Sequence, residues 1–401
     1  MSLHSRILRA PSTVGTRGAA FLLAPSVAMA LLLALAVLLP LNALAAEAPG
    51  IETGVPASAA ATDDPLLVSA PGADAPADEA GTTPGGFTAA GWAPEAGWPQ
   101  PAVHVLLVSN SPETVREPGI ALQAALEPHT RYRLFVHHVN ATGSPAPLKV
   151  TLEAASPAGA PPSPPVRART AVAGSGRSPQ PFASGWAAAS AYAESAAPWV
   201  MHRLPPDEEL DVWTTYLDPG HVATGYVLVE TDGPALLRVR LGDGDRLLPP
   251  DGVHMRGTVA DPQMEQTIAF SMSQRVLDVP FGASGAFRDR ESGSPLRGDY
   301  GVDYRLTLTA HNPFDVPMPL YLLFIPRGGD GRLLAVVDGQ VHTTPRTFSG
   351  HYYQVRRWVI QPQRTRTISI WTTPVAAMGY PAVLRFSTHL DAGWPRHPTS
   401  P

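Results

Sequence analysis

Two adjacent histidines, His137 and His138, stand in the stretch YRLFVHHVN at residues 132–140. Imidazoles are common metal ligands and general bases, so this pair is the first place to look for chemistry. Successive side chains of a β-strand point to opposite faces of its sheet, so two neighbouring rings on a strand cannot bind one metal ion together. A site would need further convergent ligands, which the sequence does not indicate. We therefore predict a buried His138, an outward His137, and no metal or cofactor.

A second stretch that could do chemistry is HYYQVRRWVI, which begins at His351. If its core face holds Tyr353 and the alternate residues after it, the opposite face exposes two aromatic rings with planar polar groups between them. The candidate ligand-binding residues on that face are Tyr352, Gln354, Arg356 and Trp358. Aromatic rings stack on sugar faces, so these residues predict a glycan platform. The alternative is that Trp358 covers the sheet edge or stacks on an arginine.

Motifs for catalysis are otherwise missing from the sequence. It contains no G-x-S-x-G elbow, no H-E-x-x-H pair, no P-loop and no dinucleotide-binding glycine pattern. Acidic pairs such as Glu208 and Glu209 could serve glycoside hydrolysis, which needs two carboxylates across a cleft, but they are typical of solvated loops. The tripeptide RGD at residues 297–299 is too short to indicate a function. We name no catalytic residue and expect a non-catalytic protein.

The strand that holds the paired histidines recurs later in the chain. The segment YRLTLTAHNPFDVPMPL from Tyr304 aligns without a gap on YRLFVHHVNATGSPAPL from Tyr132, at an offset of 172 residues. A second echo joins VWTT at residues 212–215 to IWTT at 370–373, each followed by Gly-Tyr. Preserved order with changed spacing indicates a duplicated domain.

The fold class follows from the elements that must position these residues. Short alternating or apolar runs are separated by Gly, Pro and Asp, and the chain holds 45 prolines and 35 glycines, which favours short strands over helices. The sequence predicts an all-β protein of two tandem antiparallel, immunoglobulin-like β-sandwich domains related by duplication. Alternation places Leu134 and Val136 on the core face of the first repeat. One short helix is expected after a capping Ser184 and before Pro198.

Composition divides the rest of the chain. Residues 1–45 combine three arginines with a long apolar run and an A-x-A pattern, which predicts a signal peptide or an N-terminal membrane anchor. Residues 46–101 are rich in Ala, Pro and Gly and carry a charge of -8, which predicts a disordered acidic linker. Residues 102–249 form the first predicted sandwich, with a Pro-rich loop at 156–185, residues 250–390 the second, and residues 391–401 a tail.

Charge and cysteine content exclude several functions. The net charge of -5 provides no basic field for a phosphate backbone, so we expect no nucleic-acid partner. The chain has no cysteine, which excludes disulfides, thiolate metal sites and a cysteine nucleophile. Contact with a membrane is expected only through the N-terminal segment.

The stretches GDYGVDYRLTL at residues 298–308 and RYRLFVHHVN at 131–140 resemble an uncharacterised group of exported proteins from Gram-positive bacteria. Some members carry a stalk module named after the copper amine oxidase N-terminus, which is not evident in this chain. The resemblance implies an exported protein of β-sandwich type and supplies no catalytic residues.

Together these features predict an exported, non-catalytic protein of the cell envelope or surface, built of two β-sandwich modules, with an adhesive or assembly role. Its expected location is extracellular or on the cell surface, and its expected partners are cell-wall glycan or another envelope protein. The alternative is a carbohydrate-active protein, either a glycan-binding module or a glycoside hydrolase.

Overall fold

The computed structural model describes residues 103–155, 165–194, 197–204, 208–390, 393 and 395–398, all within one compact unit that spans residues 82–401. The predicted signal or anchor at 1–45 and the predicted linker at 46–101 lie outside the described residues, as does part of the tail. Within the described ranges, no helix has the length and apolar character needed to cross a membrane.

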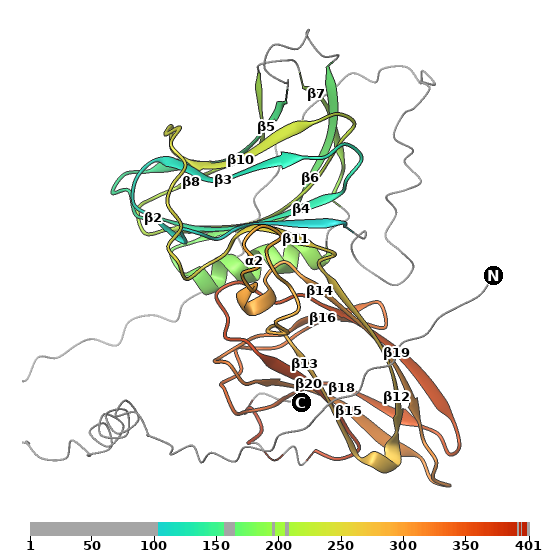
Figure 1. Ribbon diagram of the computed structural model, residues 1–401. Coiled ribbons are helices and arrows are strands. Elements are labelled where there is room, and N and C mark those ends of the chain that lie inside the picture. Colours follow the sequence, from blue (N-terminus) through green and yellow to red (C-terminus); the bar gives the residue numbers. More distant parts are fainter. Residues whose placement is uncertain are drawn as a thin grey trace, which may run out of the picture. The chain divides into compact units, whose positions relative to one another are not determined.

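The first sandwich packs a larger sheet against a smaller one (Figure 1). The larger sheet has the order β11-β1-β4-β9-β6-β7, with β2 beside β4. Its strands are β1 (Val105–Ser109), β2 (Thr114–Val115), β4 (Tyr132–Asn140), β6 (Val166–Ser178), β7 (Val200–Leu204), β9 (Val222–Thr231) and β11 (Arg256–Ala260). The smaller sheet, β3-β10-β5-β8, consists of β3 (Gly119–Leu126), β5 (Ala146–Ala154), β8 (Glu209–Leu217) and β10 (Ala235–Leu241).

The second sandwich also consists of two sheets, in the orders β12-β14-β19-β16-β17 and β13-β20-β15-β18. The first contains β12 (Gln263–Ser271), β14 (Asp303–His311), β16 (Leu334–Val337), β17 (Gln340–Thr343) and β19 (Thr365–Thr372). The other contains β13 (Val276–Phe281), β15 (Met318–Pro326), β18 (Tyr353–Ile360) and β20 (Ala382–Ser387). The described residues also form two 3₁₀ turns, Met272–Gln274 and Arg297–Asp299.

The two sandwiches have the same topology, which confirms the predicted duplication. The order β1-β4-β9-β6-β7 matches β12-β14-β19-β16-β17, and β3-β10-β5-β8 matches β13-β20-β15-β18. The parallel pair β1–β4 has its counterpart in the parallel pair β12–β14. Apart from these and β2–β4, the pairs of described strands are antiparallel.

The topology corrects the second sequence echo. VWTT lies on β8 in a smaller sheet, whereas residues 370–372 of IWTT lie on β19 in a larger sheet. The counterpart of β8 is β18, so the two tetrapeptides occupy unlike places. These two four-residue segments therefore match in sequence although they occupy different strands of the two sandwiches.

Asn140 and Asn312 give the duplication an atomic signature at the corner after β4 and β14. Each side-chain amide donates to the carbonyl four residues on, at 2.8 Å, and to the last carbonyl of a strand in the opposite sheet, at 2.7 and 2.9 Å. Each Oδ1 accepts from the backbone N–H two residues on, at 3.0 Å. Such local bonds fix a turn, so both corners lead the chain into the opposite sheet in one way.

The larger sheet of the first sandwich is buried on both faces. Leu134 and Val136 pack in the sandwich core, as predicted. The opposite face, expected to be the outer one, is covered, and Phe135 on it has no exposed surface. Helix α2 (Pro181–Glu194) and the second sandwich cover it, so the apolar core of the second sandwich continues across this face.

Helix α2 begins at Pro181 rather than after the predicted cap Ser184. Proline suits the first helical position because its missing N–H has no intrahelical partner there. The preceding turn is held by Gln180 N–H, which donates to Ser178 Oγ at 3.0 Å. Ser184 instead lies inside the helix and donates to Gly176 O at 2.9 Å.

Residues 166–178, predicted within a Pro-rich surface loop at 156–185, form strand β6. Its two glycines have a packing role: a Cβ at Gly174 would stand 2.2 Å from Ala188 O, and a Cβ at Gly176 would stand 2.2 Å from Ser184 O. Glycine in a strand permits such close backbone approach, and here it allows α2 to lie directly on β6. The predicted surface loop is therefore wrong over residues 166–178, because Gly174 and Gly176 lie inside a strand instead of interrupting it.

The chain enters the second sandwich later than the sequence boundary at 249–250 suggests. Strand β11 lies after that boundary but pairs antiparallel with β1 of the first sandwich. Gly185 of α2 touches the second sandwich, because a Cβ there would stand 2.4 Å from Ala376 O. The guanidinium of Arg332 lies 3.6 Å above the Trp186 ring of the same helix.

A buried ion pair joins the two repeats. Arg133 Nη1 on β4 lies 2.7 Å from Asp303 Oδ1 on β14, and the two side chains are 0% and 2% exposed. The same nitrogen donates to the hydroxyl of Tyr192 on α2. The Tyr192 ring stacks on Tyr226, with centroids 4.6 Å apart.

We expect Arg133→Ala to lower the free energy of unfolding by about 3–5 kcal/mol, because it leaves the Asp303 carboxylate buried and uncompensated. Urea unfolding followed by tryptophan fluorescence measures this. The double variant Arg133→Met, Asp303→Leu should recover much of the loss, since it removes both charges. Lys149→Ala is the control: its partner Asp211 is 51% exposed, so a change within about 1 kcal/mol is expected. An Arg133→Ala protein as stable as this control would contradict the assignment.

Candidate functional site

The predicted glycan platform on β18 is not assembled as one face. The pairing register of β15 and β18 shifts between Leu322 and Leu323, so Val355 has no direct partner and the alternation of β18 changes there. Trp358 is 5% exposed and packs in the core of the second sandwich, while Val359, predicted on the core face, is 48% exposed. The predicted face assignment is therefore wrong beyond the bulge.

The four predicted residues are divided between different surroundings. Tyr352 is 5% exposed and packs in a small separate cluster with Leu323, beneath the C-terminal segment, whose Pro395 O accepts from Tyr352 N–H at 3.1 Å. Gln354 is half-buried opposite Leu323. Arg356 donates to Val337 O at 3.1 Å, and its guanidinium lies 5.5 Å from the Trp358 ring, which matches the alternative of an arginine stack.

His138 has a structural role, as predicted. Its Nδ1–H donates to Pro112 O at 2.8 Å, so its Nε2 accepts from the Ser109 hydroxyl, also at 2.8 Å. Burial lowers the pKa of His138 to about 4, so the ring is neutral at pH 7. Among the described residues, no group of three or more His, Asp or Glu is placed to hold a metal ion.

His137 points to the other side and belongs to a hydrogen-bonded relay. Its Nδ1 lies 2.8 Å from Thr224 Oγ1, which lies 3.0 Å from Ser184 Oγ. The Ser184 hydroxyl donates to Gly176 O, so the Thr224 hydroxyl must donate to Ser184 and Nδ1–H must donate to Thr224. The relay therefore fixes one tautomer and leaves a lone pair on Nε2. Burial, with the nearby His138 and His254, lowers the pKa of His137 to about 3.

His137 lines a pocket of about 390 Å³ between the two sandwiches, here called the junction pocket. Its apolar wall includes Phe135 and Tyr300, whose rings stack with centroids 6.0 Å apart at 18°. Tyr380 lies edge-on to Tyr300 at 6.0 Å. Tyr300 is held in place because its hydroxyl donates to Met378 O at 2.8 Å. The pocket thus has flat rings fixed by the packing of both repeats.

Asn110, directly after β1, contributes an unpartnered polar group to the junction pocket. Its side chain is 7% exposed, and its buried Oδ1 has no hydrogen-bond partner among the described residues. A buried polar atom without a partner costs about 1–3 kcal/mol, so the amide gains free energy if it turns to pair with a bound molecule. His137 Nε2 likewise makes no hydrogen bond to any of the residues that the structure describes.

A charged cluster stands at the rim of the junction pocket. His254 Nε2 lies 2.6 Å from Glu113 Oε2, and His254 Nδ1 lies 2.8 Å from Asp251 Oδ2. A neutral imidazole has one N–H, so only the imidazolium donates to both carboxylates. Burial opposes ionisation of Asp251, but hydrogen bonds from the backbone of Glu113, His254 and Val253 and from the His254 ring lower its pKa well below the usual value. The cluster ties the segment before β2 to the segment before β11.

The rim continues into a second, more polar hollow of about 500 Å³. Four residues line both hollows: Val253, His254, Met255 and Arg297. Arg297 belongs to the RGD tripeptide, whose Asp299 is fully buried and accepts from Ser284 N–H at 2.8 Å. That tripeptide therefore forms part of a turn that shapes the pocket.

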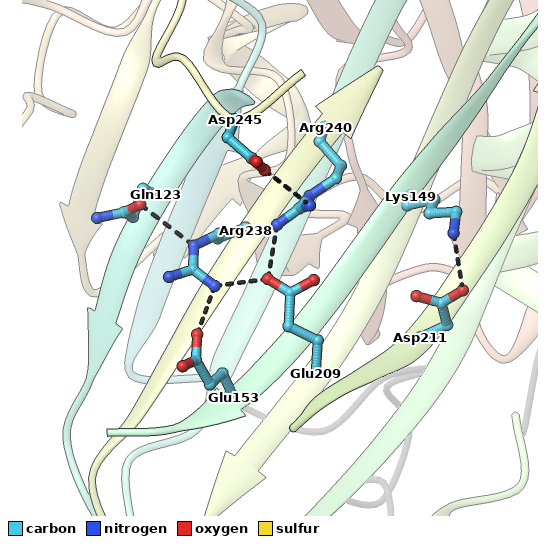
Figure 2. A network of polar contacts seen from close by, with 8 residues as sticks. All are labelled: Gln123, Lys149, Glu153, Glu209, Asp211, Arg238, Arg240 and Asp245. Carbon is cyan, nitrogen blue, oxygen red and sulfur yellow. Dashed lines mark hydrogen bonds and ion pairs between the residues drawn. The ribbon is translucent and has the colours of Figure 1, made fainter. Parts of the chain in front are cut away.

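The outer face of the smaller sheet of the first sandwich carries a different polar surface, a ladder of ion pairs (Figure 2). Arg238 and Arg240 on β10 both lie 2.6 Å from Glu209 on β8, and Lys149 lies 3.3 Å from Asp211. Each of these cations already contacts a carboxylate. The ladder connects β10, β5 and β8 across this face, and its cations are already paired, so the junction pocket is the stronger candidate site.

Sequence reasoning missed the residues that form the junction pocket. His137 was named but placed outward with a structural role, and Arg297 was noted only within RGD. Nothing in the sequence connects Asn110, Tyr300 and Tyr380, because they meet only when the two repeats pack together. The two histidines were the one available signal, and they lie on β4, which supplies His137 to the pocket lining.

Comparison with known proteins yields no family: no family model and no curated protein matches the chain. Among solved structures, Lac15 from a marine microbial metagenome is 14% identical with a TM-score of 0.15, over 66% of this chain and 54% of that chain. The N-terminal CBM22-1-CBM22-2 tandem domain from Paenibacillus barcinonensis Xyn10C is 6% identical with a TM-score of 0.14, over 63% and 82%. Likenesses this low carry no functional argument. The sheets and the pocket themselves define a two-sandwich β-protein with a ligand-sized pocket at the junction.

We expect the stability of the wild-type protein to fall as pH decreases from about 6.5 to 4, in part because His138 stays neutral in the fold while the unfolded chain takes up a proton. The folded pKa of about 4 lies below the ordinary 6.5, so this contribution is complete above pH 6.5 and is lost toward pH 4. A His138→Gln variant should show a slope smaller by up to about 1.4 kcal/mol per pH unit in urea unfolding over that range. Equal slopes would contradict a buried neutral His138.

Proposed function

We propose that the protein is an exported, non-catalytic module of the cell envelope or surface that binds a partner in the junction pocket. The single observation that carries the binding role is the unpartnered amide of Asn110, which is nine-tenths buried and lines the pocket beside His137. A pocket with fixed aromatic walls and a few polar groups without partners is typical of a ligand-binding site.

Export is supported by the sequence of the N-terminal region. Residues 1–45 have the composition of a signal peptide or anchor, and residues 46–101 that of a spacer that holds a folded unit away from a membrane or wall. The resemblance to exported proteins of Gram-positive bacteria agrees with this. An adhesive or assembly role follows if the pocket faces material outside the cell.

The described acids of the pocket region favour binding over glycoside hydrolysis. Hydrolysis needs two carboxylates that flank a sugar across a cleft. Glu113 and Asp251 instead both contact His254. Asp289, in the neighbouring hollow, accepts hydrogen bonds from Thr258 N–H and Ser292, so its carboxylate holds a turn.

Export is tested with the only lysine of the chain, Lys149, whose side chain is 29% exposed. Intact Gram-positive cells that express the full-length chain are treated with a membrane-impermeant amine reagent, and peptides are read by mass spectrometry. We expect the label on the peptide that contains Lys149, and its disappearance in Lys149→Arg. A label that appears only after the cells are lysed would overturn export.

Binding through the pocket is tested with two exposed valines. Val253 is 56% exposed and stands at the rim of the junction pocket, and Val359 is 48% exposed on β18. The full-length chain should be retained on purified envelope fragments. Val253→Trp, which blocks the rim, should abolish retention, and the matched control Val359→Trp should preserve it. Equal retention of both variants would overturn the pocket as the binding site.

A further inference from the structure

We infer that the junction pocket binds a single sugar ring, a ligand whose hydroxyls both donate and accept hydrogen bonds. This inference rests on the proposed binding function and names the class of ligand. It also moves the glycan site from β18, where the sequence placed it, to the junction of the two repeats.

The relay through Thr224 and Ser184 determines which hydrogen-bonding group a ligand must present to His137. Because Nδ1–H of His137 is committed to Thr224, its Nε2 can only accept. This nitrogen stays neutral, so it does not attract an anion. A ligand must therefore present a hydrogen-bond donor to His137.

Asn110 adds a side chain that holds both a hydrogen-bond acceptor and a hydrogen-bond donor. Its amide has an acceptor oxygen and a donor nitrogen, and the buried oxygen lacks a partner among the described residues. The oxygen has no accessible surface as the side chain stands, but a half-turn of the amide exchanges the oxygen and the nitrogen. A sugar hydroxyl both donates and accepts, so it pairs with whichever end of the amide faces the pocket.

The aromatic wall suits the apolar face of a sugar ring. Phe135 stacks on Tyr300, and its ring is also nearly parallel to His137, at 4° with centroids 6.4 Å apart. Phe135 is fully buried and backs Tyr300, so the partly exposed ring of Tyr300 is the flat surface that contacts the C–H face of a pyranose while the hydroxyls at its edge reach the polar groups. A volume of about 390 Å³ is near the lower end of ligand pockets, which favours one ring over a longer chain inside the pocket.

Charge disfavours ionic ligands of the same size. Rim charges of both signs, Arg297 and Glu113, favour neither a carboxylate nor an ammonium group over the other. A carboxylate offers acceptors only, so it leaves the lone pair of His137 without a donor. An ammonium group offers donors only, so it leaves the Asn110 amide nitrogen without an acceptor. Hydroxyls satisfy acceptors and donors alike without a net charge, so they fit the whole set.

The experiment titrates the full-length chain by calorimetry with three kinds of probe. The first is the methyl glycosides of glucose, galactose and N-acetylglucosamine; the others are cyclohexylamine and cyclohexanecarboxylate, which are rings of similar size with opposite charges. We expect a methyl glycoside to bind, and neither charged ring to compete with it. Val253→Trp should abolish binding and Val359→Trp should leave it unchanged.

Two further variants test the relay and the amide. Asn110→Leu should weaken glycoside binding at least about tenfold by removing a hydrogen-bonding group. Ser184→Ala should also weaken it, although Ser184 is a positioning residue, because loss of its hydroxyl frees the Thr224 proton and releases the tautomer of His137. Circular dichroism and the urea midpoint check that each variant is folded.

The outcomes separate this inference from the proposed function. A charged ring that binds in place of the glycosides, and is displaced by Val253→Trp, overturns the sugar class and leaves the binding function standing. Retention of the chain on envelope fragments through the pocket, together with no binding of any methyl glycoside, also overturns the sugar class and leaves the binding function standing. If Val253→Trp changes neither the retention of the chain on envelope fragments nor the binding of any probe, both proposals fail. A glycoside that binds equally to wild type, Asn110→Leu and Ser184→Ala overturns the inference.

Discussion

The buried pair of Arg133 and Asp303 is the constraint on which the arrangement of the two repeats depends. A guanidinium with no exposed surface is tolerated only where a carboxylate compensates it, and here that carboxylate comes from the other repeat. The pair therefore makes the second sandwich a condition for burying the outer face of the first. Helix α2 adds to the same contact through the Tyr192 hydroxyl. Phe135, two residues along β4 from Arg133, lines the junction pocket, and both repeats supply its walls.

Much of the fold could be predicted because its signals are local. Alternation in the stretch from Tyr132 identified a strand and its core face, and the ungapped match to the stretch from Tyr304 identified the duplication. The structure repeats even the bonds of Asn140 at Asn312, because a corner formed by one side chain and its near neighbours is encoded within a few residues. Strand β6 was missed for the converse reason: Gly174 and Gly176 have a role only in relation to a helix that packs on them.

The candidate site could be predicted only in small part. A strict two-residue period placed Trp358 outside, and the bulge at Val355, which depends on pairing with β15, turned it inward. Asn110 and Tyr300 are far apart in the chain and carry no shared motif. The state of His137 is further removed still, since its proton is placed by a hydroxyl on β9, a hydroxyl on α2 and a carbonyl on β6.

The glycines beneath α2 have a consequence for how this protein can vary. Where a helix rests on a sheet through side chains, exchanges of larger for smaller residues change the spacing of the layers gradually. At Gly174 and Gly176 the two backbones meet directly, and no smaller residue exists. The height of Ser184 above β6 is therefore a fixed dimension of the scaffold. Substitutions at the rim of the junction pocket can then accumulate among descendants of this chain, while the hydroxyl that orients His137 keeps its place.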